Sequence, residues 1–168
     1  MKALVSIIMG STSDYNVMEK AAKFLDEQQI PFEINALSAH RTPKEVSEFA
    51  KNAEERGIKV IIAGAGMAAA LPGVIAAETS LPVIGVPIKG SFDGLDAVMS
   101  ILQMPPAVPV ATMAVNGALN AAVLAMEILA LTDNTIKEKV HNYKNTLKEK
   151  IVKANEEFAQ IKFDYKVN

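Results

Sequence analysis

Apolar and polar positions alternate along the chain as short continuous runs and longer amphipathic stretches. Unbroken aliphatic runs are typical of parallel strands covered on both faces, and they occur at 4–9, 59–65 and 81–87, with shorter ones at 31–37 and 108–115. Apolar residues at helical spacing predict helices over 15–29, 71–78 and 117–131. A further helix is predicted to start at Pro43, where Thr42 can cap it and Glu45 can complete a capping box.

This alternation of strands and helices predicts a doubly wound α/β domain with a parallel sheet. In such a domain the loops after the strands gather at one edge of the sheet, where ligands bind. Four loops are expected at that edge: GSTSD (10–14), SAHRTP (38–43), GAGMAAALPG (64–73) and PIKGSFDG (87–94). Every segment with candidate chemistry falls in one of them.

The chain changes character at Asp133, where a strongly charged amphipathic stretch begins. Its apolar positions share a single helical face: Ile136, Val140, Tyr143, Leu147, Ile151 and Val152. We therefore expect a single domain over 1–168, with an α/β core (1–131) and a C-terminal helical extension (132–168). The apolar face could fold back on its own sheet, but the small size of the sheet favours oligomer contacts.

Composition narrows the function classes. A length of 168 residues suits one domain, and a net charge of −2 argues against a nucleic-acid or membrane partner. The absence of cysteine excludes disulfides and thiolate chemistry, and it suits a cytoplasmic location. The N-terminal apolar run is too short for a signal sequence, and polar residues interrupt the longest apolar tract, 107–131. We expect a soluble protein.

The first loop, GSTSD, offers backbone N–H groups and hydroxyls that suit a phosphate, and Asp14 suits a ribose diol. Ordinary helix capping by Ser13 or Asp14 explains this loop about equally well. The glycine-rich loop departs from the dinucleotide-binding pattern, and the chain holds no P-loop motif. No metal site is expected, because no carboxylate cluster joins His40 and the only other histidine is His141.

His40 and Arg41 stand side by side in a chain that has only two histidines and two arginines. At the ligand edge an imidazole can give and take a proton near neutral pH, and a guanidinium can grip a phosphate. The alternative is that the pair has no role in function: His40 would be a loop residue that caps backbone groups, and Arg41 a surface charge. The position of the pair, before a helix and facing GSTSD across the edge, favours the functional one.

Five segments, collinear over 4–131, resemble the class I 5-(carboxyamino)imidazole ribonucleotide mutase family, also called the catalytic subunit of phosphoribosylaminoimidazole carboxylase: MGSTSD, LSAHRTP, AGAGMAAALPG, GVPIKGSFDGLDA and LQMPPAVPVATMAV. The resemblance implies a flavodoxin-like three-layer α/β/α sandwich that forms homo-octamers. It also implies a step of de novo purine (IMP) biosynthesis that needs no cofactor, downstream of an ATP-dependent synthase.

In that family a carboxylate moves from an exocyclic nitrogen to a ring carbon, through loss and recapture of CO2. The resemblance assigns the proton transfers to His40, the phosphate to Arg41 and the ribose to Asp14. The other residues that it implies in substrate binding are Ser11, Ser13, Ser38, Gly64, Gly66 and Met67.

The glycine-rich loop departs from the family pattern GAGGAAHLPG, since Met67 and Ala70 replace a glycine and a histidine. Two alternatives to the mutase therefore stay open. One is direct carboxylation of aminoimidazole ribonucleotide by CO2, and the other is a non-catalytic nucleotide-binding module.

Overall fold

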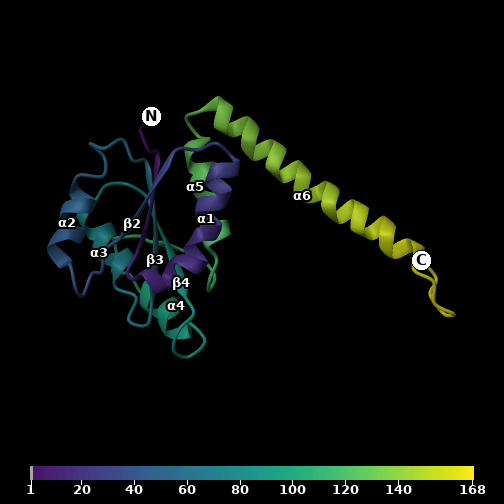
Figure 1. The fold of residues 1–168 in the computed structure, drawn as a ribbon, viewed down its shortest axis with the longest axis horizontal. Helices are drawn as coiled ribbons and strands as arrows, with labels where there is room; N and C mark the ends of the chain where they lie inside the picture. Colours follow the sequence, from purple (N-terminus) through teal and green to yellow (C-terminus); the bar gives the residue numbers. More distant parts are fainter. Residues whose placement is uncertain (1) are drawn as a thin grey trace.

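A parallel sheet of five strands lies at the centre of the structure, a computed structural model that describes residues 2–168 (Figure 1). The strand order is β2-β1-β3-β4-β5, and the order reverses between β1 and β3. The strands are β1 (Val5–Met9), β2 (Phe32–Ala36), β3 (Val60–Gly66), β4 (Val83–Ile88) and β5 (Ala111–Thr112). All five strands coincide with the predicted runs, although β3 and β4 each extend one residue beyond them. The fifth is far shorter than 108–115 because only two of its residues pair with β4.

Helices cover both faces of the sheet, which makes three layers (Figure 1). One face carries α1 (Tyr15–Glu27) and α5 (Ala118–Leu129), and the other carries α2 (Pro43–Lys51), α3 (Leu71–Glu78) and α4 (Leu95–Leu102). A short 3-10 helix, η1 (Thr12–Asp14), leads into α1. This arrangement is the predicted flavodoxin-like α/β fold. Only α4 was not among the predicted helices.

Aliphatic side chains fill two core layers, one on each face of the sheet. The unbroken runs of β1, β3 and β4 are buried because helices cover them on both sides. Small residues allow the layers to approach closely. A Cβ atom added to Gly85 of β4 would lie 2.6 Å from Cγ2 of Ile101 in α4, so only glycine fits there.

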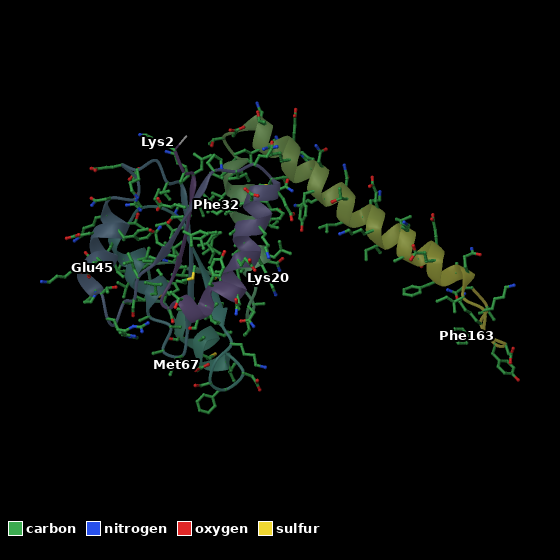
Figure 2. The ribbon with its side chains drawn as sticks, in the orientation of Figure 1. Lys2, Lys20, Phe32, Glu45, Met67 and Phe163 are labelled. Atoms are coloured by element: carbon green, nitrogen blue, oxygen red, sulfur yellow. The ribbon has the colours of Figure 1, made fainter. Side chains whose placement is uncertain are left out.

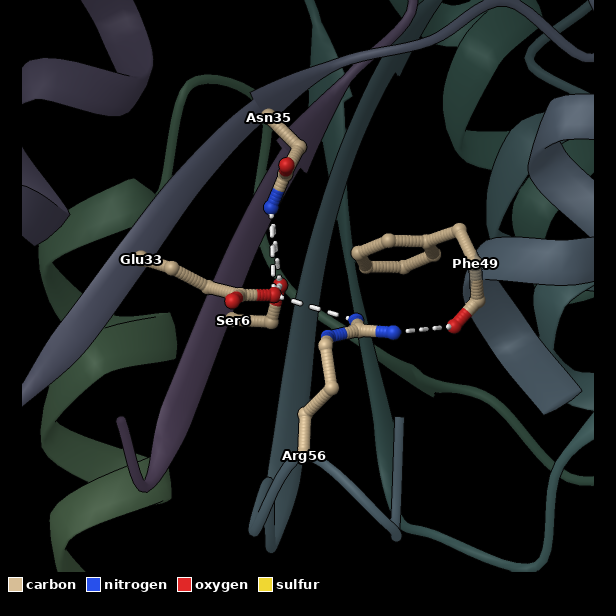
Figure 3. Close-up of polar contacts among 5 residues, drawn as sticks. All are labelled: Ser6, Glu33, Asn35, Phe49 and Arg56. Atoms are coloured by element: carbon tan, nitrogen blue, oxygen red, sulfur yellow. Dashed lines mark hydrogen bonds and ion pairs between the residues drawn. The ribbon is translucent and has the colours of Figure 1, made fainter. Parts of the chain in front are cut away.

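Ser6 is the one buried polar residue among the described core positions, and it belongs to a polar cluster at the β2 edge (Figure 3). Its hydroxyl donates to Glu33 Oε1 at 2.9 Å, and the same oxygen accepts from Asn35 at 3.2 Å and from Arg56 at 3.1 Å. Arg56 also donates to the carbonyl of Phe49 and stacks on its ring, 4.8 Å from the centroid. The cluster ties the edge strand to β1 and to the end of α2.

The C-terminal helix α6 (Asn134–Gln160) starts on the core and then leaves it (Figure 1). Asp133 caps it by accepting from the backbone N–H groups of Thr135 and Ile136 at 2.8 and 3.1 Å. Ile136 and Val140 are buried in the core layer of α1 and α5, and Tyr143 meets Phe24 edge to face. The first turns therefore fold back on the chain's own core.

Beyond Tyr143 the helix projects away from the body, and its apolar side chains are exposed, among them Leu147, Ile151 and Phe158. Within residues 2–168, no helix combines the length and the apolar character needed to cross a membrane.

Candidate active site

A cleft of about 610 Å³ opens at the carboxyl ends of β1 to β4, beside the point where the strand order reverses. Parts of all four predicted loops line it, so their expected convergence is observed. Residues from the loops after β1 and β2 form a polar wall: Ser11, Ser13, Asp14, Ser38, His40 and Arg41. Residues after β3 and at the end of β4 form an apolar wall: Met67, Ala68, Ala69, Ala70, Leu71 and Ile88.

The loop after β1 holds its hydroxyl groups by local hydrogen bonds. Ser11 caps η1 by accepting from the N–H of Ser13, and the Ser13 hydroxyl lies 2.8 Å from Ser11 Oγ and 3.3 Å from Asp14 Oδ1. Asp14 precedes α1 but makes no side-chain cap bond. Capping by Ser13 or Asp14 therefore does not explain this loop, since Ser11 alone performs it.

Asp14 is half-buried at the cleft. Burial raises the pKa of its carboxyl, and the hydrogen bond from Ser13 and the charge of Arg41 offset only part of that rise. Its carboxylate is thus partly desolvated and turned toward a cleft, where it can accept hydrogen bonds from ligand hydroxyls.

The loop after β2 is closed by Thr42. The Thr42 hydroxyl accepts from the Ser38 N–H at 2.9 Å and lies 3.1 Å from the Ser38 carbonyl. It makes no cap bond to α2, so the predicted capping box is wrong, although the helix does start at Pro43. The hydroxyl instead fixes the turn that carries His40.

Arg41 joins the first two loops. Its Nη2 donates to the Gly10 carbonyl at 2.7 Å, and its Nε donates to Ser38 Oγ at 3.2 Å. A guanidinium has five N–H donors, so others are left for an anion. His40 next to it is exposed at the cleft, which leaves the imidazole open to a ligand.

The apolar wall includes two residues in the left-handed region of backbone conformation, Met67 at φ 56° and Ala69 at φ 42°. The Ser100 hydroxyl of α4 donates to the Ala68 carbonyl and so braces the turn. Gly66 also lines the cleft, and a Cβ atom there would lie 3.3 Å from the Ile88 carbonyl oxygen.

The structure thus brings eight of the nine residues expected from the sequence to one cleft and leaves out Gly64. That glycine is buried within β3, where a Cβ atom would lie 2.5 Å from Sδ of Met18. The remaining residues that line the cleft were not singled out as binding candidates from the sequence: Gly10, Ala39, Ala65, 68–71 and 88–90. Their loops were identified, but alanines and isoleucines carry no motif. His141 is exposed on α6.

Among residues 2–168, no group of three or more His, Cys, Asp or Glu side chains is placed to hold a metal ion. The lining of the cleft supplies an imidazole, a guanidinium, an amine, a carboxylate and several hydroxyls, together with apolar side chains.

Comparison with known proteins agrees with this site. The AIR carboxylase family model matches residues 4–150. An N5-carboxyaminoimidazole ribonucleotide mutase from Pyrococcus horikoshii is 57% identical over 151 residues, covering 89% of this chain and 85% of that protein. The phosphoribosylaminoimidazole carboxylase of Candida glabrata is 47% identical over 97% of this chain but only 29% of its own length.

Among solved structures, PurE from Treponema denticola aligns with a TM-score of 0.84 at 33% identity, covering 93% of this chain and 98% of that one. Both the sequence and the fold therefore lead to the same conclusion. The chain belongs to the AIR carboxylase family.

Proposed function

We propose that the protein is a mutase that converts 5-(carboxyamino)imidazole ribonucleotide into 5-amino-1-(5-phospho-D-ribosyl)imidazole-4-carboxylate, in de novo purine (IMP) biosynthesis. The observation that carries the proposal is the two-sided cleft. In a chain of the AIR carboxylase family, the cleft combines His40 and Arg41 from the loop after β2 with apolar residues from the loop after β3.

The polar wall supplies the binding groups. Arg41 binds the phosphate with the donors that its bonds to Gly10 and Ser38 leave over. Asp14 accepts from the ribose hydroxyls, and Ser11, Ser13 and Ser38 offer further hydroxyls. Because Arg41 already ties two loops together, much of its side-chain entropy is lost before the ligand arrives, which favours binding.

His40 carries the proton. The bond between the exocyclic nitrogen and the carboxylate carbon breaks, CO2 leaves, and His40 protonates the nitrogen. The ring carbon then bonds to the same CO2, and the proton lost from that carbon returns to His40. The proton is conserved over the cycle, so the net reaction is an isomerisation.

Confinement makes the second step fast. A CO2 molecule held against the ring carbon reacts as if within one molecule, at an effective concentration that free solution cannot reach. The apolar wall excludes water from the site of this step.

The assembly and surroundings belong to the same proposal. We infer a homo-octamer in the cytoplasm, supplied by an ATP-dependent synthase that makes the carbamate. Support for the assembly comes from the distal half of α6, whose apolar residues are exposed in the single chain.

Direct carboxylation of aminoimidazole ribonucleotide by CO2 is the second candidate. One relative, 47% identical, carries the name of a carboxylase, and Ala70 stands where the mutase pattern has a histidine. Parallel assays decide between the two. Turnover of the carbamate without bicarbonate supports the mutase, whereas product formed only with aminoimidazole ribonucleotide and bicarbonate supports the carboxylase.

His40→Asn tests the proton transfer. We expect kcat to fall by roughly 10²- to 10⁴-fold with ligand binding retained, because asparagine fills the place but cannot shuttle a proton. Retention of most activity would exclude His40 from the role. A wild-type protein that turns over neither substrate, yet binds the nucleotide, would indicate the non-catalytic module.

A further inference from the structure

Met67 is the most exposed large apolar side chain that lines the cleft. It lies in the turn after β3, and 65% of it is exposed. Its Cγ lies 3.8 Å from where a Cβ of Gly90 would be, so the side chain sits between the loops after β3 and β4. Figure 2 labels Met67 at the end of the α/β body opposite the end from which α6 departs.

The backbone of Met67 has a φ of 56°, a region that glycine enters freely and that other residues enter at a cost. The exposed side chain packs against little of the protein, so the folded chain regains only part of that cost. Strain of this kind at a ligand site is a reason to look for a function of the side chain. Here the part of the molecule that it faces is the cleft.

We propose that the thioether side chain of Met67 closes the apolar half of the cleft and retains the CO2 that the carbamate releases. This inference rests on the proposed function and assigns a specific step to one side chain. Retention matters because recapture by the ring carbon competes with escape through the mouth of the cleft.

The chemistry of the wall suits this task. CO2 has no net dipole and donates no hydrogen bonds. Alanine, leucine and isoleucine side chains can therefore contact it without providing polar groups that would bind water. Ala68 to Leu71 and Ile88 line the same cleft, and Leu71 and Ile88 are buried whereas Met67 is exposed. An unbranched, polarisable side chain adapts to an irregular gap, as a cover over a bound ligand requires.

The test measures escape directly. Unlabelled carbamate is supplied in buffer that contains ¹³C-bicarbonate and carbonic anhydrase, and the fraction of product that carries ¹³C is determined. Every label in the product reports a CO2 that escaped and was replaced from solution. A blank without protein corrects for spontaneous loss of CO2 from the carbamate.

Three variants separate side chain from backbone. Met67→Ala removes the thioether and keeps a Cβ at the strained position, whereas Met67→Gly removes both. We expect both to raise the labelled fraction several-fold and to leave more free aminoimidazole ribonucleotide per product. Met67→Leu, which restores apolar bulk, should lower the label again relative to Met67→Ala.

Phe92→Ala is the matched control. Phe92 is also exposed, at 82%, and has a φ of 46°, but it does not line the cleft. We expect its labelled fraction to equal that of the wild type. All four variants change exposed side chains, and glycine suits the Met67 backbone, so each is expected to fold.

The outcomes also separate this inference from the function on which it rests. A wild-type protein that forms product only from added bicarbonate overturns the mutase itself. If the labelled fraction is low in the wild type and equally low in Met67→Ala, the role of Met67 is overturned. The mutase activity itself would still stand in that case. Label that rises in Met67→Gly alone would assign retention to the backbone and overturn it too.

Discussion

The polar cluster of Ser6, Glu33, Asn35 and Arg56 makes a strong prediction about the stability of the β2 edge, from which the His40 loop continues. One oxygen, Oε1 of Glu33, accepts from all three neighbours, at 2.9 to 3.2 Å (Figure 3). Ser6 is fully buried, so its hydroxyl depends on that oxygen. Glu33→Ala removes the common acceptor.

The expected cost has two parts. A buried hydroxyl left without its acceptor costs about 1–3 kcal/mol. The ion pair with Arg56 adds less than about 1 kcal/mol, because both side chains are about one-third exposed, at 34% and 30%. We therefore expect Glu33→Ala to lower the free energy of unfolding by roughly 2–3 kcal/mol.

Ser6→Ala provides the matched background. It removes the hydroxyl together with its need for an acceptor and should cost only about 1 kcal/mol. In this background Glu33→Ala should cost about 1 kcal/mol, since no hydroxyl is left stranded, which gives a coupling of about 1–2 kcal/mol.

The assay is urea unfolding of the wild type, both single variants and the double variant, at one fixed protomer concentration because assembly shifts the apparent stability. Costs that add to within about 0.5 kcal/mol would refute the reasoning, since distant independent sites behave that way. Equal kcat in all four proteins would show that the cluster acts on stability alone.

Three further predictions concern the cleft and α6. Arg41→Ala should raise KM by roughly 10- to 100-fold with a smaller effect on kcat, because a charge-assisted hydrogen bond is worth about 1.5–3 kcal/mol; a change in kcat alone would contradict a phosphate contact. Burial raises the Asp14 pKa, so the folded state favours the neutral carboxyl. The ionised carboxylate therefore destabilises the fold at neutral pH, and this destabilisation disappears as the pH falls and the carboxyl is protonated. Asp14→Asn should therefore stabilise the protein against urea more at pH 7 than at about pH 4, and it should weaken substrate binding. A gain in stability that is the same at both pH values would disprove the linkage. A chain that ends after Thr146 keeps the core contacts of Ile136, Val140 and Tyr143 but loses the exposed distal face, so light scattering should show a folded protein of lower assembly mass, and an unchanged mass would exclude that face from assembly.

Some parts of the candidate site can be predicted from the sequence and others cannot. His40, Arg41 and Asp14 could be identified because chemically distinctive residues follow apolar runs, and parallel strands deliver those residues to one edge. The apolar wall was harder to assign residue by residue. Alanines and an isoleucine at the end of a strand look like ordinary core, and only the position of the cleft shows that they face it.

The sequence alone determined the order of the five strands, every helix of the α/β body except α4, the four loops and the edge at which they meet. These follow from apolar periodicity and from the handedness of crossovers, which are properties of neighbouring residues and of polypeptide chirality. The tertiary structure alone decided that Thr42 bonds to Ser38 rather than capping α2, that Gly66 and not Gly64 reaches the cleft, and that α6 leaves the core after Tyr143. Each of these depends on distances between groups from different elements, and those distances exist only once the layers have packed.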